Sequence, residues 1–266
     1  MIPKVIHFCW LSGDPFPNEI AECLVSWKTV LKEYELWLWG KKPVDCLGLH
    51  VIEKPFDVNA ILWCKQAYES KKYAFAADYI RVFAVYTYGG IYLDSDVMMY
   101  KSFDDLLSLP YFLGEDAFHC FEPAIFGAEK GTLWVKEVLD RYEGLEFINK
   151  DGSLNMRGLP VVFHDRLCSK YSFEYSSTKG NYLYKTDIIR IFPSDYFNSR
   201  NFIEPIRTKD SYCSHHFVGS WLKKQKTFSY YFKAMVPHCL LNIVYALMFK
   251  FVYSKRMHDV IIPYNK

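Results

Sequence analysis

The sequence predicts an α/β protein, and three observations support this fold class. A strand-like run at 4–10 is followed by a helical pattern and then by a second strand-like run at 35–39. This β-α-β order is typical of a parallel sheet with right-handed crossovers. The chain has 266 residues, of which 51% are hydrophobic and 23% charged, so it can bury a substantial core and is not disordered.

The opening β-α-β unit has clear local signals. The run KVIHFCW at 4–10 is β-branched, apolar and aromatic, which favours a buried strand, and the Ser-Gly-Asp-Pro cluster at 12–15 ends it. Asn18 is a suitable N-cap for the helix that follows. Apolar residues recur at helical spacing in this helix at Ile20, Leu24, Trp27 and Leu31. The run ELWLW at 35–39 predicts the second strand.

Two helices and a short strand are predicted next. Asn59 is a candidate cap for a helix that runs to about Lys71, and a second helix covers about 73–88. The pair Gly89-Gly90 ends the second helix in the usual way. A short buried strand, Ile-Tyr-Leu, follows at 91–93.

The rest of the chain gives weaker signals. Further strands are predicted at 97–100, 111–113, 124–126 and 188–192. A helix is predicted at 132–142 with four inward-facing residues, Leu133, Val135, Val138 and Leu139. Residues 144–185 show no confident periodicity, and no internal repeat or linker divides the chain, so one α/β domain with a C-terminal extension is expected.

Composition narrows the class of protein further. The chain carries 32 Lys and Arg against 30 Asp and Glu, which argues against a nucleic-acid binder. Its 8 cysteines are scattered without a C-x-x-C pair, which favours reduced thiols over a disulfide framework or a zinc site. The N-terminus lacks the charged and apolar regions of a cleaved signal peptide, so we expect a cytoplasmic protein.

A pair of aspartates is the main chemical signal. Asp94 and Asp96, with Ser95 between them, directly follow the strand at 91–93. Open α/β sheets bind ligands at the carboxyl ends of their strands. Two carboxylates in this spacing can share a divalent cation and leave positions open for phosphate oxygens. Such a cation would neutralise charge on a departing diphosphate.

The preceding helix adds a second charged pair. Asp78 and Arg81 are three residues apart and so share one helix face. The guanidinium can offer a planar set of donors to a carboxylate, a sugar hydroxyl or a phosphate. A D-x-D turn alone is often solvated, and an Asp–Arg pair on a helix is often a surface ion pair. Their succession without a gap favours a functional site.

Three runs resemble a known enzyme family. IPKVIHFCW, KKYAFAADYIRVFAVYTYGGIYLDSDV and HHFVGSW are similar to the DXD-containing transferases of glycosyltransferase family 32, which includes bacterial capsular and surface polysaccharide enzymes and, more distantly, clostridial glucosylating toxins. The resemblance covers the first third closely and returns near 191–222. It implies a GT-A fold, in which a Rossmann-like half and an acceptor half share one mixed sheet. We expect this catalytic domain over 1–222 and a C-terminal helical extension over 223–266.

The resemblance also implies roles for residues of the central motif. In the family the D-x-D carboxylates hold Mn²⁺ or Mg²⁺, so Asp96 is the expected metal ligand and Asp94 the expected contact of the ribose or donor sugar. Asp78 and Arg81 match the residues that grip the hydroxyls of the donor sugar. Trp10 matches the aromatic residue that stacks on the nucleotide base, although a place at the rim of the core is nearly as compatible with its position.

The late motif implies further contacts. His216 corresponds best to the family's late metal ligand, with His215 as the second choice. Ser220 and Trp221 would flank the diphosphate and donate hydrogen bonds to it.

Three other polar residues are not assigned to the chemistry. We expect His7 to be a packed histidine of the first strand. Asp116 and Glu122 follow the strand at 111–113, where contact with an acceptor is conceivable, but a solvated loop is the favoured interpretation.

The implied function is a metal-dependent, retaining hexosyl transfer in surface polysaccharide synthesis. A nucleotide sugar would donate the hexose, with UDP-Gal, UDP-Glc, UDP-GlcNAc and GDP-Man as candidates and a UDP-sugar favoured. The acceptor would be a glycan or lipid-linked glycan. Two alternatives stay open: a nucleotidyl- or phosphosugar transferase, for which 11–17 is a poor phosphate loop, and a non-catalytic, metal-dependent carbohydrate-binding protein.

The C-terminal segment has its own character. Residues 222–258 carry seven basic side chains and no acidic ones, around the apolar run CLLNIVYALMF at 239–249. Eleven residues are too few for a membrane-spanning helix, which needs about 20. Peripheral contact with the inner face of an anionic membrane and packing on the catalytic domain are both compatible with this pattern.

Overall fold

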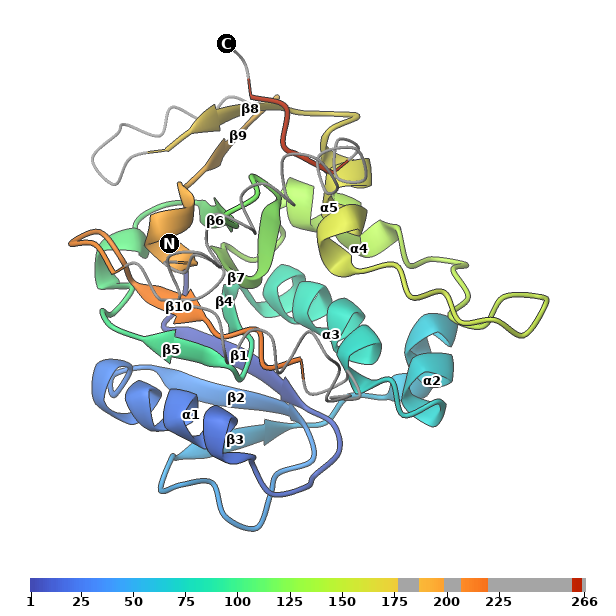
Figure 1. Cartoon of the computed structure of the whole chain (residues 1–266), viewed down its shortest axis with the longest axis horizontal. Helices are drawn as coiled ribbons and strands as arrows, with labels where there is room; N and C mark the ends of the chain where they lie inside the picture. Colours follow the sequence, from blue (N-terminus) through green and yellow to red (C-terminus); the bar gives the residue numbers. More distant parts are fainter. Residues whose placement is uncertain (177–186, 199–206, 220–259, 265–266) are drawn as a thin grey trace, which may run out of the picture.

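The predicted α/β class with a mixed central sheet is confirmed by the computed structural model, which describes residues 1–176, 187–198, 207–219 and 260–264 (Figure 1). Six strands form the central sheet in the order β3-β2-β1-β4-β7-β6. They are β1 (Val5–Trp10), β2 (Glu35–Gly40), β3 (Val51–Lys54), β4 (Gly90–Leu93), β6 (Tyr111–Glu115) and β7 (Phe121–Ala128).

The sheet combines two kinds of strand pairing. From β3 to β4 neighbouring strands are parallel, whereas β7 is antiparallel to both β4 and β6. A parallel nucleotide-binding type of half thus continues into an antiparallel half within one sheet, which is the GT-A arrangement that the resemblance implies. Two small sheets flank it: β5 (Val97–Met99) with β10 (Cys213–His215), antiparallel, and β8 (Ser172–Tyr175) with β9 (Ile188–Ile191), parallel.

Helices connect these strands. The α-helices are α1 (Asn18–Val30), α2 (Leu62–Glu69), α3 (Tyr73–Tyr88), α4 (Leu133–Asp140), α5 (Leu159–Leu167) and α6 (Ser194–Phe197). Two 3₁₀ turns, η1 (Val58–Ala60) and η2 (Asp104–Leu106), complete the described set. None of the described helices is long and apolar enough to cross a membrane.

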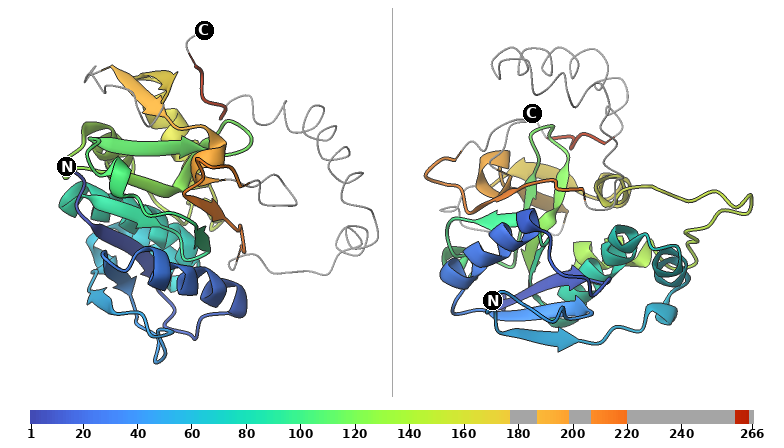
Figure 2. Two further views of the ribbon diagram at one scale, coloured as in Figure 1. Left: turned by 90° about the vertical axis from the view of Figure 1, so that its left-hand side faces the viewer. Right: turned by 60° about the horizontal axis from the view of Figure 1, so that its bottom comes forward.

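Each face of the sheet has its own apolar core. Successive strand residues point to opposite faces, so Leu36 and Leu38 of β2 pack with α1 while Trp39 packs with α2 and α3. The apolar residues predicted for α1 lie in the first of these cores, and α4 and α5 contribute to the second. In the two views of Figure 2, the strands accordingly run between α1 and the group of α2 and α3.

The glycine pair after α3 fixes how the helix meets β4. Gly89 and Gly90 have φ angles of 69° and 105°, which residues with a Cβ rarely adopt. A Cβ on Gly90 would lie 2.8 Å from the carbonyl oxygen of Val5. The chain therefore reverses tightly against β1, and the helix residues Asp78 and Arg81 come to lie next to the end of β4.

His7 of β1 is fully buried beside this reversal, as expected. Its Nε2–H donates to the carbonyl oxygen of Gly89 at 2.7 Å, and its Nδ1 accepts from the indole N–H of Trp39 at 3.1 Å. Both ring nitrogens are thus used by the neutral imidazole. Burial lowers the pKa of His7 to about 4.

The boundaries of two helices differ from the prediction. α1 begins at Asn18, with Pro17 at the N-cap position and no side-chain cap. Asn59 does not cap a long helix, because the carboxylate of Asp57 accepts the backbone N–H of Asn59 and closes a 3₁₀ turn before α2 begins at Leu62.

The predicted inward face of the helix near 132–142 is partly wrong. Leu133 is 66% exposed, whereas Trp134, Val135 and Val138 are buried. The large indole of Trp134 takes the core position and turns α4 so that its neighbour points outward.

Several short elements were not predicted. They are β3, β10, α6 and the turns η1 and η2, together with α5 and β8 in the region at 144–185 without clear periodicity. The described cysteines are free thiols, in agreement with the prediction for that part of the chain. The predicted boundary at 222/223 and the whole basic segment at 222–258 lie outside the described residues.

The last described residues pack on the domain. Ile262 is buried, and its N–H donates to the carbonyl oxygen of His119 at 2.9 Å. The hydroxyl of Tyr264 donates to Glu115 at 2.7 Å, and its ring stacks on Tyr175 with the ring centroids 4.0 Å apart. The chain end therefore returns to the β6–β7 hairpin.

Candidate functional site

A cavity of about 750 Å³ lies at the carboxyl ends of β1 and β4. It is lined by most of the residues that the sequence singled out. Among them are Trp10, Asp78, Arg81, Asp94, Asp96 and His215. The fold therefore brings α3, the D-x-D turn and β10 to one place, although they are up to 137 positions apart in the chain.

The first group in the wall is an arginine between two carboxylates, which we call the arginine cluster. Arg81 is only 6% exposed and Asp78 8%. Arg81 Nη2 lies 3.1 Å from Asp78 Oδ1, and Nη1 lies 3.0 Å from Asp94 Oδ2. Nη1 also donates to the carbonyl oxygen of Pro123 at 3.1 Å, so the guanidinium joins α3, β7 and the D-x-D turn.

Burial and charge act against each other in this cluster. Burial raises the pKa of Asp78 to about 7, although Arg81 opposes the change, and burial also raises the pKa of Asp94. Burial alone would lower the pKa of Arg81, but the two carboxylates outweigh it and the pKa stays well above its ordinary value. Arg81 is therefore a permanent cation.

The D-x-D turn is held by backbone and side-chain hydrogen bonds. Asp94 N–H donates to the carbonyl oxygen of Ala124 at 2.9 Å, and the hydroxyl of Tyr92 donates to Asp94 Oδ1 at 2.8 Å. Asp96 Oδ2 accepts from the N–H of Val218 at 2.9 Å, and its carbonyl oxygen accepts from the N–H of His216 at 3.0 Å. Asp96 therefore joins the turn to the segment that follows β10.

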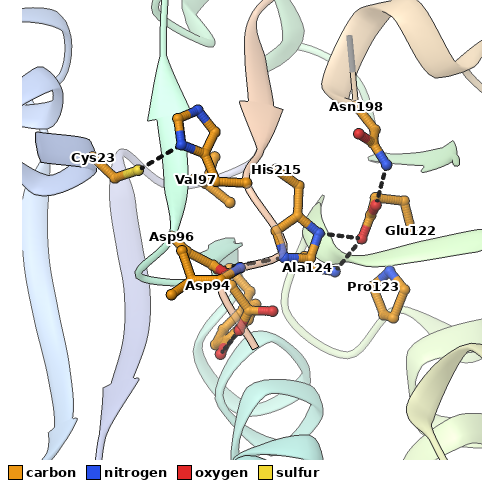
Figure 3. Close-up of polar contacts among 12 residues, drawn as sticks. Cys23, Asp94, Asp96, Val97, Glu122, Pro123, Ala124, Asn198 and His215 are labelled. Atoms are coloured by element: carbon orange, nitrogen blue, oxygen red, sulfur yellow. Dashed lines mark hydrogen bonds and ion pairs between the residues drawn. The ribbon is translucent and has the colours of Figure 1, made fainter. Parts of the chain in front are cut away.

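The second group is a histidine between two carboxylates, which we call the histidine cluster (Figure 3). His215 Nε2 lies 3.4 Å from Asp96 Oδ1, and Nδ1 lies 3.2 Å from Glu122 Oε1. Burial opposes a charged imidazole, but Glu122 and Asp96 outweigh it and raise the pKa of His215 well above its ordinary value. Burial would likewise raise the pKa of Asp96, but His215 and the Val218 N–H bring it down to about 2.

Three of these side chains offer ligand atoms to one metal ion. Asp94, Asp96 and His215 each present one such atom, and the three atoms lie within 4.8 Å of one another. The side chains of Asp96 and His215 are 14% and 12% exposed, so they are shielded but reachable from the cavity. Two carboxylate oxygens and an imidazole nitrogen are a suitable donor set for a divalent cation.

The structure reverses the expected order of the two late histidines. His215, the second choice, faces Asp96 and Glu122, whereas His216 Nδ1 lies 3.7 Å from the Cys23 sulfur on α1. His215 is the last residue of β10 and His216 follows it, and successive side chains along an extended chain point to opposite sides. The structure therefore groups His215, and not His216, with Asp94 and Asp96, and the role of His215 as a metal ligand is a proposal.

The other predicted contacts are placed as follows. Trp10 is half-buried at the cavity, with its indole N–H donating to the carbonyl oxygen of Asp14 at 2.8 Å and its ring centroid 4.8 Å from that of Phe16. Its ring can therefore offer a face, whereas its N–H is already engaged. Ser220 and Trp221 lie outside the described residues.

Two acidic residues expected in a solvated loop are instead part of the cavity wall. Glu122 lies in β7 and is 3% exposed, and burial raises the pKa of Asp116 to about 7. The solvated-loop interpretation is therefore wrong for Glu122 and does not describe Asp116. An alternation of apolar and polar residues from Phe121 onward would have predicted a strand that includes Glu122. Pro123 interrupts this alternation in the sequence.

Comparison with known proteins agrees with this geometry. Residues 17–113 match the family described as "Glycosyltransferase sugar-binding region containing DXD motif". The match includes α1, the arginine cluster and the D-x-D turn, and it ends before β10.

Similar proteins include two with related names. Inositol phosphoceramide mannosyltransferase 3 of Schizosaccharomyces pombe is 28% identical over 139 residues, which cover 52% of this chain and 36% of that protein. Uncharacterized glycosyltransferase L373 of Acanthamoeba polyphaga mimivirus is 22% identical over 242 residues, covering 88% and 89%. Among solved structures, the PaToxG glycosyltransferase aligns with a TM-score of 0.46 and 19% identity, over 63% of this chain and 68% of that one.

The yeast relative is much longer than the region it shares, since this chain spans about a third of its length. Asp94-Ser95-Asp96 falls inside the matched family region and inside the cavity wall. Residues 17–113 of this chain therefore match a glycosyltransferase sugar-binding region containing a DXD motif.

Proposed function

We propose that this chain is a metal-dependent glycosyltransferase that moves a hexose from a nucleotide sugar to a glycan or lipid-linked glycan with retention of anomeric configuration. One observation carries the proposal. The ligand atoms of Asp94, Asp96 and His215 lie within 4.8 Å of one another at the wall of the 750 Å³ cavity. The arginine cluster shares Asp94 with this group, so a cation and a donor sugar can be held side by side.

The metal would be held by Asp96 and His215, with Asp94 as the third ligand or as a contact of the ribose or donor sugar. Carboxylates suit both Mg²⁺ and Mn²⁺, and the imidazole nitrogen favours Mn²⁺. When bound, the ion supplies positive charge that stabilises the leaving diphosphate.

The chain's own residues bind and orient the donor. Arg81, held by Asp78, lies in the cavity wall, where the family resemblance implies contact with sugar hydroxyls. Trp10 offers an aromatic face for the base. Ser220 and Trp221 stay predictions of diphosphate contacts.

The reaction is a substitution at the anomeric carbon of the donor. The bond from this carbon to the diphosphate oxygen breaks, and a bond to the acceptor oxygen forms on the same face. The proton of the acceptor hydroxyl passes to an oxygen of the departing diphosphate. The protein's part is to hold both substrates in place and to stabilise charge.

The donor is proposed from resemblance. A UDP-sugar follows from the bacterial members of the family, whereas the name of the yeast relative points to a mannosyl donor. UDP-Gal, UDP-Glc, UDP-GlcNAc and GDP-Man are thus the panel to test. A role in surface polysaccharide synthesis, and membrane contact by the basic segment, belong to the same proposal.

Thermal unfolding with nucleotide and metal tests the proposal. We expect UDP or GDP together with Mn²⁺ to raise the melting temperature by several degrees, because a ligand that binds the folded state stabilises it. Each component alone should have a smaller effect, and Asp96→Ala should abolish the joint effect. Asp105→Ala, at an exposed ion pair with Lys101, is the control and should behave like wild type.

Product analysis separates the alternatives. With the four nucleotide sugars and Mn²⁺, a glycosyltransferase releases free nucleoside diphosphate and sugar, whereas a nucleotidyl- or phosphosugar transferase releases a sugar phosphate. A joint nucleotide and metal effect that persists in Asp96→Ala would refute the metal site. Binding without turnover on any donor would favour a carbohydrate-binding protein.

A further inference from the structure

Glu122 is a buried acid whose side chain forms three hydrogen bonds, one of them with the histidine of the candidate metal site. Its Oε1 lies 3.2 Å from His215 Nδ1 and accepts from the N–H of Ala124 at 3.2 Å. Its Oε2 accepts from the side-chain amide of Asn198 at 2.6 Å. We infer that Glu122 is a positioning residue that holds His215 with Nε2 toward Asp96 and the cation, an inference that rests on the proposed function.

An imidazole needs such a partner in order to bind a metal with one chosen nitrogen. The nitrogen that does not bind the ion normally donates to a carboxylate or carbonyl, which fixes the tautomer and the ring orientation. In the histidine cluster Nε2 lies on the Asp96 side and Nδ1 on the Glu122 side. The two nitrogens of His215 thus have separate partners at opposite ends of the ring.

The ring face is restrained as well. The centroid of Phe217 lies 3.9 Å from that of His215, with 33° between the ring planes. Phe217 has a φ of 49°, which is rare for a bulky residue, and the bonds from the N–H groups of His216 and Val218 to Asp96 hold the chain on both sides of it. Glu122 therefore fixes the ring in its plane, and Phe217 limits tilting out of the plane.

Glu122 is itself held by the segment that supports the rest of the site. The next residue, Pro123, accepts a bond from Arg81 through its carbonyl oxygen at 3.1 Å. The carbonyl oxygen of Ala124 accepts the N–H of Asp94 at 2.9 Å. Three consecutive residues of β7 thus contact the histidine cluster, the arginine cluster and the D-x-D turn, so the position of His215 is tied to that of Asp94.

Asn198 supports the placement of Glu122 from the side opposite His215. It is 2% exposed, and its amide nitrogen donates to Glu122. Its amide oxygen is buried without a hydrogen-bond partner among the described residues. An unsatisfied buried oxygen costs stability. The amide of Asn198 nevertheless has this orientation, because only its NH₂ group can donate a hydrogen bond to the carboxylate of Glu122.

The test is the affinity for Mn²⁺ of the full chain, measured by calorimetry without nucleotide. Glu122→Gln keeps the size of the side chain and removes its charge, and we expect Mn²⁺ binding to weaken about 10-fold or more, since loss of such a supporting partner costs about 10–100-fold. Glu122→Ala should weaken it further, and Asn198→Ala by less. The graded order distinguishes a positioning role from a purely structural one, which would lower the melting temperature without changing the affinity at a temperature where each variant is folded.

Glu115→Gln is the matched control. Glu115 is also a buried glutamate of the same sheet, is 2% exposed, and lies 3.0 Å from a histidine, His119. It is not among the residues that line the cavity, and it accepts hydrogen bonds from Tyr175 of β8 and from Tyr264 near the chain end. We expect this variant to bind Mn²⁺ within about 2-fold of wild type, since none of the three candidate ligands depends on it.

The outcomes separate this inference from the proposed function. If wild type binds Mn²⁺ and Glu122→Gln binds it with equal affinity, the positioning role of Glu122 is overturned and the metal site stands. Failure of wild type to bind Mn²⁺, with or without nucleotide, overturns the metal site and the inference with it. If Glu122→Gln does not fold, Asn198→Ala decides the question, and an unchanged affinity in that variant overturns the inference.

Discussion

The arginine cluster and the histidine cluster have the same plan, since each places one nitrogen cation between two carboxylates. They differ in the cation. Arg81 contacts Asp78 and Asp94 at 3.1 and 3.0 Å and keeps its charge at all relevant pH values. His215 lies between Asp96 and Glu122 at 3.4 and 3.2 Å, and an imidazole can give up a proton and bind a metal instead.

This difference indicates a division of labour. With all carboxylates ionised, each cluster carries one more negative than positive charge when His215 is protonated, so the cavity wall attracts cations. The arginine cluster has no vacant lone pair on its nitrogen and can only donate hydrogen bonds. The histidine cluster has a nitrogen that can become a ligand. The first is therefore suited to fix geometry and the second to bind the ion.

Removal of the permanent cation should have the largest effect. Arg81→Met keeps much of the side-chain volume but removes the cation that contacts both Asp78 and Asp94 in a buried site, so we expect a loss of about 3–5 kcal/mol in the free energy of unfolding. Denaturant titration at pH 7 measures this. Asp78→Asn in the same chain should restore part of the loss, because it replaces one of the two buried carboxyl groups that lose their cation.

Arg157→Met is the control for this prediction. Arg157 pairs with Asp165 where both side chains are exposed, and such pairs contribute less than about 1 kcal/mol. If Arg81→Met destabilises the protein no more than Arg157→Met does, the arginine cluster does not fix the geometry of the site.

His7 sharpens the comparison because it is a buried imidazole without carboxylate partners. Its pKa is lowered from 6.5 to about 4, so the unfolded chain binds a proton that the folded chain does not between these values. Stability should therefore fall as the pH drops from 6.5 to 4, by about 3 kcal/mol at about 1.36 kcal/mol for each pH unit. Above 6.5 this contribution is fully present. Denaturant titrations across pH 4–7 measure the slope.

Other groups titrate in the same range, so the informative quantity is a difference between variants. His7→Gln should remove the contribution of His7 and flatten the slope relative to wild type. His50→Gln, at an exposed position, should leave it unchanged. Equal slopes in all three proteins would contradict the assignment of His7 as a neutral, hydrogen-bonded core residue.

Much of the fold was predictable from sequence where periodicity and breakers coincide. β1, α1, β2 and α3 combine long apolar patterns with Gly or Pro at their ends, and they lie close to their predicted positions. β3 and β10 were not predicted because, unlike the equally short β4 and β5, they mix polar with apolar residues (VIEK and CSH) and are too short to show alternation. β3 forms by pairing with β2, and β10 forms by pairing with β5, which is more than 100 residues away in the chain.

The site shows the same limit. Asp78, Arg81, Asp94 and Asp96 were identifiable because they lie within 19 consecutive residues of one motif. Glu122 joins the site only through long-range contacts, which no local pattern reveals. The choice between the adjacent histidines depends on the register of β10 against β5, and one position in a strand reverses the direction of a side chain.

The two histidines provide the last and smallest expected effect. His215→Gln should weaken Mn²⁺ binding about 10–100-fold, or about 1.4–2.7 kcal/mol, because it removes the nitrogen ligand of the group formed with Asp94 and Asp96. His216→Gln should change the affinity by less than about 3-fold, because that ring lies toward Cys23 and its link to Asp96 is through the backbone N–H. Calorimetry on both variants measures the contrast, and circular dichroism checks that each is folded. A larger loss in His216→Gln would mean that β10 presents its other face to the ion, and the division of labour between the two clusters would then fail.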